Sequence, residues 1–558
     1  DSIYQVTHRF SVLVISKTPC SSNVNYMNDE NPHDSSEEKP SPEKLGRRGF
    51  IITMGFGVAA SALLRKLPSK TDTKLSQAAA EKVSFPATST STTLPSSSTT
   101  LNNSELPNEI QTVFETVISG GRVIDPDSGY DAIANIGIEG KTIKFISSDP
   151  LNGKTKIDAT GLVVSPGFID VLSYPTNGYG EWYKIADGVT SNLCMHGIDN
   201  PMQKFLESTG VHSPPVNYGG AVDHYEHRKI LGVGIQKTSL EERSLLLDLA
   251  EKDLQAGAIG IHQQPEYTVD LKKSEIIDHG RLAAKYEIPL CLHLRHSYDK
   301  EFGSQENAIN EALEVARETG CSIHIEHLNS TGGTGRMREA ISQIQSARDE
   351  GHEITACVYP YTFWATYAGS ARFDNFQNKF GISFEDLQEV GKPNRMTEET
   401  FSIARKDNKL VAAFAMSEED ITDALSASWV LIGSDSILER PHNNHPRSAG
   451  CFSRFLGTYV RERKVLTLPD ALGRITILPS RLLEKSCSSM KNRGRIQPGA
   501  IADITMFDPR EISDRADVSN PAQESVGIVH VMVNGQLARS NSKNNNVKSG
   551  VPILRDTL

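Results

Sequence analysis

Several features that mark particular classes of protein are scarce in this sequence. Seven cysteines among 558 residues are too few for the disulfide framework that small secreted domains need. Basic residues number 58 against 69 acidic ones, giving a net charge of -11, and they form no basic stripe, so we expect no nucleic-acid partner. The composition also excludes a fibre, a multi-span membrane protein and a fully disordered chain.

What is present suits a large folded protein. Apolar residues make up 38% of the chain, which is enough for one large domain and a smaller one. Several cysteines lie inside apolar, strand-like runs, where Cys usually behaves as a small buried hydrophobic residue. We therefore predict reduced core thiols. The seven are Cys20, Cys194, Cys291, Cys321, Cys357, Cys451 and Cys487.

Residues 1–112 differ in composition from the rest of the chain. Arg47 and Arg48 precede an apolar stretch that ends at Leu64 and is too short to span a membrane as a helix, which resembles a twin-arginine export signal. The alternative is an ordinary amphiphilic helix after a chance arginine pair. Residues 84–104 are mostly Ser, Thr and Pro, which predicts a disordered linker. We expect no integral membrane domain, and a periplasmic or envelope location if the signal is real and a cytoplasmic one otherwise.

The remaining residues divide into a long middle segment and two β-rich flanks. Short apolar runs, punctuated by Gly and Asp-Pro, fill residues 113–165 and 491–545. Residues 166–490 alternate strand-like runs with helical periods, as a βα barrel does. The sequence therefore predicts an α/β fold with a TIM-like (β/α)8 barrel, a small β-sandwich domain built from both flanks, and a tail over residues 546–558.

Strand candidates in the middle segment indicate where catalytic groups should lie. Functional residues of such barrels gather where the strands end. The candidates are residues 162–169, 190–195, 258–262, 289–294, 322–328, 355–359 and 430–434. Polar residues at the ends of these runs are therefore the first candidates for a site.

Five short motifs in a fixed order resemble one known superfamily. Pro166–Asp170 after an apolar strand, Gly433–Asp435 at a strand end, and Pro498–Ile504 resemble the amidohydrolase superfamily. Val358–Tyr361 and His445–Arg447 are similar to its N-acyl-D-amino-acid deacylase branch, within which the sequence is most similar to N-acyl-D-glutamate deacylases. The match extends over residues 113–538, and it makes D-glutamate a hypothesis about substrate.

The superfamily pattern fails at one position. Members normally follow Pro-Gly-Phe-Ile-Asp with two histidines that hold one metal, whereas the corresponding residues here are Leu172 and Tyr174. Leu cannot bind a metal, and Tyr rarely binds zinc, whose usual donors are imidazole, thiolate and carboxylate. The first metal position is therefore expected to be empty or remodelled, and an inactive relative is one alternative.

The resemblance implies that the other metal position is intact. In the branch it is held by a Cys and two His at three strand ends, and the register places His196, His293 and His327 there. Three neutral imidazoles and a water complete a tetrahedral zinc site of the catalytic type. The expected cofactor is one divalent metal ion, zinc. Each His taken alone could instead be a hydrogen-bonded core residue.

Asp435 aligns with the general base of the family at the end of the last barrel strand. A carboxylate beside a metal-activated water can take its proton during attack on an amide carbon and deliver it to the leaving amine. An ordinary helix N-cap or turn residue is the alternative for Asp435. The strands offer no lysine suited to carboxylation, which argues against a hydantoinase-type site with two metals.

Substrate-binding residues are predicted from the same resemblance and from charge. Tyr267 and Tyr361 resemble positions that line the pocket of the branch. Arg295 and Arg372 could replace a branch lysine that is Asn329 here, because a guanidinium suits a carboxylate, although Arg295 could equally form a structural salt bridge.

One acidic residue near this predicted pocket has two possible roles. Glu266 stands where the branch usually has an apolar residue. Its carboxylate could approach the metal or bind a substrate ammonium or hydroxyl group. The alternative is an ordinary solvated loop residue.

Together these residues predict a metal-dependent amide hydrolase of a small-molecule substrate, an N-acyl-D-amino acid. Two alternatives stay open: a cyclic amide or lactone hydrolase of the same superfamily, and a non-catalytic barrel that has lost its first metal site. A homo-oligomer is compatible with all three.

Overall fold

The computed structural model describes residues 113–199, 201–298, 305–440 and 444–557. The predicted export signal and the Ser/Thr-rich linker lie outside these residues. Within them, no helix combines the length and the apolar character that crossing a membrane requires.

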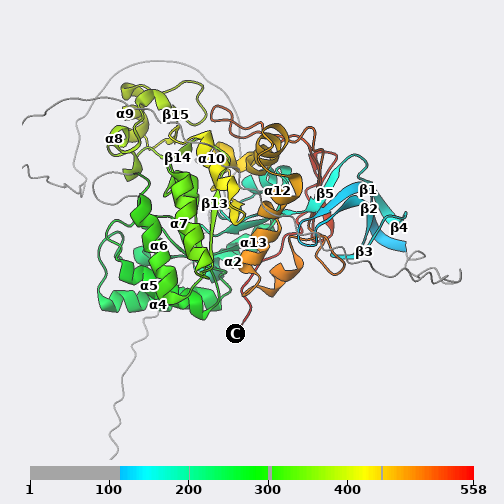
Figure 1. Cartoon of the computed structure of the whole chain (residues 1–558), viewed down its shortest axis with the longest axis horizontal. Helices are drawn as coiled ribbons and strands as arrows, with labels where there is room; N and C mark the ends of the chain where they lie inside the picture. The colour runs from blue at the N-terminus through cyan, green and yellow to red at the C-terminus, as the bar shows by residue number, and fades with distance from the viewer. Residues whose placement is uncertain (1–112, 200, 299–304, 441–443, 558) are drawn as a thin grey trace, which may run out of the picture. The chain divides into compact units, whose positions relative to one another are not determined.

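Pairings and hydrogen bonds arrange the parallel strands in the middle of the chain as a ring, and helices lie beside them (Figure 1). Hydrogen bonding divides the ring into a ladder of β6, β7 and β8 and a longer ladder from β9 to β17, and only Ala221 separates β8 from β9. The strands are β6 (Phe168–Asp170), β7 (Val189–Cys194), β8 (Asn217–Gly220), β9 (Val222–Asp223), β10 (Ile261–Gln263), β11 (Leu290–Leu292), β12 (Ile323–Ile325), β13 (Ile354–Val358) and β17 (Val430–Ile432).

The two ends of the ring meet between β17 and β6. No ladder joins these strands in the described part of the chain, but single hydrogen bonds do. The backbone N–H of Asp435 donates to the carbonyl of Leu172 over 2.7 Å, and that of Ser434 donates to Oδ1 of Asp170 over 3.0 Å. These bonds place Asp435 beside the first strand of the barrel, although 264 positions separate Ser434 from Asp170 in the sequence.

The outer helices follow from their sequence period. In α6 (Gln305–Thr319) the buried residues Ala308, Ala312 and Ala316 are spaced four apart, and Ile309 and Leu313 repeat the same spacing one residue later. This spacing gives one apolar stripe, which packs against the barrel. α4 (Leu240–Gln255), α5 (Lys273–Lys285) and α7 (Met337–Asp349) lie beside α6 (Figure 1).

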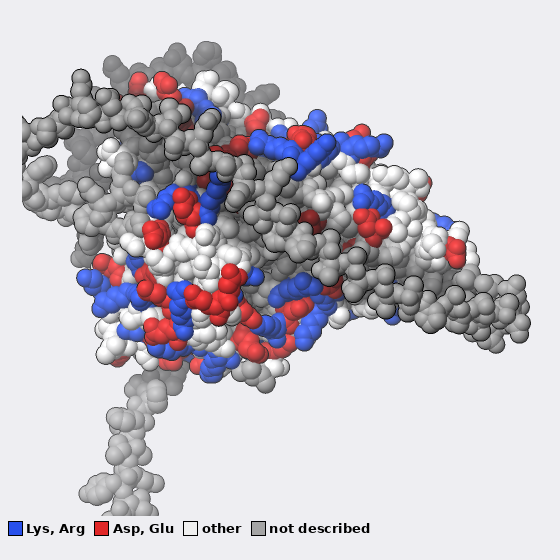
Figure 2. Space-filling view, viewed as in Figure 1, with Lys and Arg blue, Asp and Glu red and all other residues white. Residues whose placement is uncertain are grey.

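Charges of both signs mix on the face that these helices cover. Figure 2 shows basic and acidic side chains interspersed over this region. Neighbouring helices are joined by ion pairs such as Lys285 with Glu251 at 2.6 Å and Arg281 with Glu318 at 2.7 Å. Exposed pairs of this kind add little stability each, roughly 0–1 kcal/mol.

Both flanks of the chain build one β-sheet of nine strands. Its strands are β1 (Val113–Asp125), β2 (Tyr130–Glu139), β3 (Thr142–Ser147), β4 (Asn152–Asp158), β5 (Val163–Pro166), β18 (Ile504–Phe507), β19 (Ile528–Val533), β20 (Gln536–Ser540) and β21 (Lys543–Asn544). β5 from the first flank pairs antiparallel with β18 from the second. Strands from before and after the barrel therefore share one sheet, in agreement with the predicted use of both flanks.

Between β13 and β17 the chain forms an insertion (residues 364–413) that the sequence did not predict. It holds a three-stranded antiparallel sheet of β14 (Trp364–Tyr367), β16 (Leu410–Ala413) and β15 (Leu387–Glu389), with α8 (Phe376–Phe380) and α9 (Glu398–Lys406). Its core is aromatic: the rings of Phe373 and Phe376 both lie 5.4 Å from that of Phe401. The insertion forms the upper left of Figure 1.

Residues 546–557, predicted as a tail, lie against the barrel. The backbone N–H of Ile553 donates to the carbonyl of Tyr218 over 2.7 Å, and Tyr218 donates in turn to Val551 over 3.1 Å. The side chain of Ile553 is fully buried. Residues 546–557 therefore cover the edge of β8. The few apolar residues of this segment were not enough to predict that role from the sequence.

Candidate metal centre and catalytic pocket

A cavity of about 810 Å³ opens where the barrel strands end. Residues 364–367 and 369–372 of the insertion form one wall of it. The barrel side is lined by Tyr174, His196, Tyr267, His293, His327, Tyr359 and Asp435, among others. The predicted metal ligands and the predicted base therefore share one cavity.

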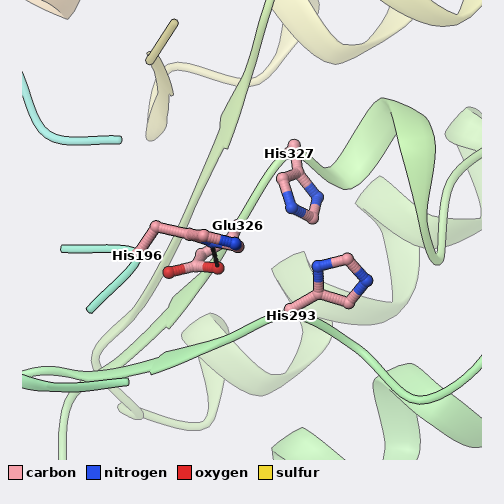
Figure 3. Close-up of side chains that lie close together, drawn as sticks. All are labelled: His196, His293, Glu326 and His327. Atoms are coloured by element: carbon pink, nitrogen blue, oxygen red, sulfur yellow. Dashed lines mark hydrogen bonds and ion pairs between the residues drawn. The ribbon is translucent and has the colours of Figure 1, made fainter. Parts of the chain in front are cut away.

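Three imidazoles that line this cavity lie close to one buried carboxylate, that of Glu326 (Figure 3). The rings of His293 and His327 lie 4.5 Å apart, and that of His196 lies 6.0 Å from His293 and 5.7 Å from His327. With Glu326 they offer four ligand atoms that all lie within 4.8 Å of one another. This set is suited to a metal ion, because imidazole and carboxylate are common ligands of zinc.

The strand ends explain how these histidines come together. His196 follows β7, His293 follows β11 directly, and His327 lies two residues beyond β12. At His327 the backbone adopts a φ of +28°, outside the extended range, so the chain leaves the strand and enters a short 3-10 turn at Leu328–Ser330. Successive side chains of a strand point to opposite faces, but His327 lies at a bend, so this rule does not fix the direction of its side chain.

The nitrogen atoms that could bind a metal can be identified from the hydrogen bonds. Nε2 of His293 bonds to Oε2 of Glu266 over 2.7 Å, which leaves Nδ1. Among the described residues, neither Nδ1 of His293 nor Nδ1 of His327 has a hydrogen-bond partner, and both are buried. Burial lowers the pKa of both rings, that of His327 strongly, so both are neutral as a ligand must be. The residues therefore fit a divalent metal ion.

Glu326 and His262 belong to the site but were not predicted from sequence. Oε2 of Glu326 lies 2.6 Å from Nδ1 of His196, and Oε1 lies 3.0 Å from Nδ1 of His262. Burial alone would raise the pKa of Glu326, but the two imidazoles hold it well below its usual range. Burial likewise opposes the charge of His196, yet Glu326 raises the pKa of that ring to about 9.

The sequence held a signal for each of these two residues. Glu326 is adjacent to His327, and His262 ends a predicted strand. Only the fold shows that they meet, because His196, His262 and Glu326 come from three different strands.

Asp435 follows β17 and faces the cavity. Its backbone φ is +50°, a left-handed conformation that is uncommon outside Gly, Asn and Asp. Oδ2 accepts a hydrogen bond from Nη2 of Arg447 over 2.8 Å. Oδ1 is buried and has no partner among the described residues, so one oxygen of the carboxylate remains available.

Leu172 and Tyr174 stand at the two positions where the resemblance implied metal-binding histidines. Leu172 is fully buried in an apolar cluster with Val171 and Leu193. Tyr174 lines the cavity, and its ring lies 5.4 Å from that of His196 in an edge-on arrangement. Burial, reinforced by the charge of Asp435, raises the pKa of Tyr174 well above its usual value, so it stays a neutral phenol.

Two of the predicted substrate-binding residues line the cavity, and a third, Glu266, pairs with one of them. The two that line the cavity are Tyr267 and Arg372. Glu266 links Arg372 to the metal site, because its Oε2 accepts hydrogen bonds from both Nε2 of His293 and Nη1 of Arg372, the latter over 3.1 Å. Burial opposes ionisation of Glu266, but Arg372 and His293 lower its pKa to about 2.

The structure places the other two, Tyr361 and Arg295, away from the cavity. The ring of Tyr361 is buried between Phe363, at 5.5 Å, and the guanidinium of Arg454, at 5.0 Å. Tyr359, two residues earlier, lines the cavity instead. Arg295 makes the structural salt bridge that was its alternative: its Nε donates to Glu311 over 3.0 Å, and its Nη2 donates to the carbonyl of Leu271 over 2.9 Å.

Known proteins are similar to this chain in sequence. Residues 291–539 match the model of the Amidohydrolase family. The chain is 29% identical over 474 residues to an N-acyl-D-glutamate deacylase of Alcaligenes xylosoxydans xylosoxydans, a match that covers 76% of this chain and 94% of the relative. A D-aminoacylase of the same organism is 26% identical over 468 residues, with 76% and 94% covered.

A solved structure gives the same result. The N-acyl-D-glutamate deacylase of Bordetella bronchiseptica, in complex with zinc and a phosphonate inhibitor, is 25% identical and superposes with a TM-score of 0.69. The alignment covers 80% of this chain and all of that one. In sequence, in fold and in its strand-end histidines, the chain is therefore similar to proteins of the amidohydrolase family.

Proposed function

We propose that this protein is a metal-dependent amide hydrolase that removes the acyl group from N-acyl-D-amino acids, and that N-acyl-D-glutamate is the substrate to test first. One observation carries the proposal: His196, His293, His327 and Asp435 line one cavity, where Nδ1 of His293, Nδ1 of His327 and Oδ1 of Asp435 have no hydrogen-bond partner among the described residues. The relatives named as deacylases of D-glutamate and other D-amino acids support the choice of substrate.

We assign the cofactor as a single zinc ion held by His196, His293 and His327. Two protein ligands at the other family position are replaced by Leu172 and Tyr174, and neither side chain is a usual zinc donor. A zinc ion at the three imidazoles would make a water molecule more acidic and would polarise the amide carbonyl of the substrate.

Asp435 is the general base and then the general acid. Its free Oδ1 can take the proton from the attacking water, while Arg447 holds Oδ2 and keeps the carboxylate in one orientation. The same oxygen can then give the proton to the amine nitrogen as the C–N bond breaks. Water, amide and carboxylate must be held within hydrogen-bond reach, and the shared cavity provides that proximity.

Positive charge in the insertion wall suits an acidic substrate. The guanidinium of Arg372 lies over the ring of Trp364 at 4.4 Å, and Nη2 donates to the carbonyl of Ser330. These contacts fix Arg372 at the cavity, where it can receive a substrate carboxylate. Asn329 cannot take this role, because its amide donates to the carbonyl of Tyr359 over 2.9 Å.

A substrate panel tests the proposed function. Full-length protein is stripped of metal with a chelator, reloaded with zinc, and assayed for release of free amine from N-acetyl-D-glutamate and from its L-enantiomer. Dihydroorotate and hydantoin serve as cyclic amides. Hydrolysis of the D-compound in the zinc-loaded protein alone is the expected result. Opening of the cyclic amides with no deacylation would favour the cyclic amide hydrolase, and no turnover of any compound would favour the non-catalytic barrel.

A further inference from the structure

The carboxylate of Glu326 is enclosed between two imidazole rings. Oε2 lies 2.6 Å from Nδ1 of His196, and Oε1 lies 3.0 Å from Nδ1 of His262. The side chain of Glu326 has no exposed surface, that of His262 is 1% exposed and that of His196 is 10% exposed. Figure 3 marks the bond between Glu326 and His196.

This trio is assembled from distant parts of the chain. His196 follows β7, His262 lies on β10, and Glu326 follows β12. The two rings approach each other to 4.5 Å between centroids. A buried carboxylate is costly unless charged or hydrogen-bonding groups compensate it. Within the described residues, the hydrogen bonds of the Glu326 side chain run to these two rings.

The bond to Glu326 determines which nitrogen of His196 can bind a metal. An ionised carboxylate only accepts hydrogen bonds, so Nδ1 of His196 carries the proton and Nε2 is left for the metal. A carboxylate in this position also fixes the orientation of the ring and makes it a stronger donor to the metal. The three neutral imidazoles bring no negative charge to the metal site. Glu326 supplies one negative charge, and one hydrogen bond joins it to the ligand His196.

Glu266, the hydrogen-bond partner of His293, differs from Glu326 because an arginine neutralises its negative charge. Glu266 holds Nε2 of His293 over 2.7 Å, but the same oxygen also pairs with Arg372 over 3.1 Å. The positive guanidinium offsets the charge that Glu266 would otherwise transmit to the metal site. Glu326 pairs with imidazoles alone among the described residues, so its charge is directed at His196.

We propose that Glu326 is a positioning residue for the metal ligand His196 and that His262 holds Glu326 in place for this role. The inference rests on the proposed function, because it requires a metal ion at His196. It adds two residues to the metal centre, neither of which has to touch the ion or the substrate.

Metal affinity tests this role without relying on activity. Zinc dissociation constants are measured by competition with a chromophoric chelator for the full-length wild type, Glu326→Gln, His262→Gln and the control Glu311→Gln. Glu311 pairs with Arg295 away from the cavity, so its replacement should leave the affinity unchanged. We expect Glu326→Gln to weaken zinc binding by about 10- to 100-fold, the range for such partners of metal ligands, and His262→Gln to weaken it less.

A second measurement distinguishes positioning from direct ligation. The visible absorption of Co²⁺ reports coordination number, so the cobalt-loaded wild type and Glu326→Gln are compared. Weaker binding with unchanged cobalt band intensities supports the inference. A changed coordination number would mean that Glu326 is itself a ligand, and zinc binding as tight as in the wild type would mean that it has no role; either result overturns the inference. A wild type that binds no zinc overturns the proposed function as well, which separates the two failures.

Discussion

Nη2 of Arg447 donates to Oδ2 of Asp435 over 2.8 Å and to the backbone carbonyl of the same residue over 3.1 Å. Arg447 is almost fully buried, and its guanidinium also lies 3.7 Å from the centre of the Tyr359 ring. One oxygen of Asp435 is thereby fixed while the other remains available. The arginine and the left-handed backbone at Asp435 together hold the proposed base toward the cavity.

Replacing Arg447 should therefore impair catalysis without removing the metal. In Arg447→Lys the ammonium lacks the planar geometry with which the guanidinium holds both the carboxylate and the backbone carbonyl of Asp435. We expect kcat/KM for N-acetyl-D-glutamate to fall by about 100-fold, the typical effect of a small misplacement of a reacting group. Arg454→Lys is the control, because Arg454 lies over Tyr361 outside the cavity. Equal losses in both variants would show a general packing defect instead.

Asp435→Asn removes the proton acceptor and keeps nearly the same shape. Turnover should fall by about 10²–10⁴-fold, the usual contribution of a general acid–base group. Zinc content, measured by atomic emission, should stay as in the wild type because Asp435 is not an assigned ligand. Loss of zinc from this variant would contradict the assigned role. Asp278→Asn, which breaks a pair with Arg243 on the helical side, serves as the control.

The two arginines considered for substrate binding should behave differently. Arg372→Gln removes positive charge from the cavity wall, so we expect KM for N-acetyl-D-glutamate to rise by about 10-fold, equivalent to about 1.4 kcal/mol. Arg295→Gln should leave both kinetic constants unchanged and cost about 1 kcal/mol of stability or less, because its pair with Glu311 is partly exposed. A raised KM in Arg295→Gln alone would reverse this assignment.

Acid sensitivity should come in part from His279, which is buried outside the cavity. Burial, reinforced by the nearby His224, lowers the pKa of His279 to about 3 in the folded protein, against 6.5 as its ordinary value. Between pH 6.5 and 3 the unfolded chain binds a proton that the folded chain does not, so stability falls as pH falls.

The variant His279→Gln isolates this contribution. The free energy of unfolding is measured with urea at several pH values from 6.5 to 4 and plotted against pH. The slope of this plot should be smaller in the variant than in the wild type by the contribution of one proton, about 1.4 kcal/mol per pH unit. The comparison of slopes is independent of any constant loss of stability in the variant. Identical slopes for the two proteins would contradict the assigned pKa.

The sequence indicated which polar residues follow single barrel strands. His196, His293, His327 and Asp435 each follow a barrel strand, and parallel strands in a barrel bring their ends to one face. The joining of both flanks into one sheet followed from two β-rich segments around an alternating middle. These features depend on short-range patterns, which a sequence displays directly.

Features that depend on contacts between distant segments were missed. The role of Glu326 requires two rings from other strands, so its neighbour His327 gave no indication of it. Tyr359 and Tyr361 lie two residues apart, but only Tyr359 lines the cavity, because the chain leaves the strand at Val358. The insertion is held by contacts among its own aromatic rings, such as Phe376 with Phe401, and these rings form no simple period.

We propose that one metal ion at the three imidazoles activates the enzyme. The most direct test is to titrate zinc into metal-free, full-length protein while following release of D-glutamate from N-acetyl-D-glutamate. Activity should rise linearly and reach a plateau at one equivalent of zinc per chain. Activity that appears only as a second equivalent is added, or no turnover at any ratio, would contradict it.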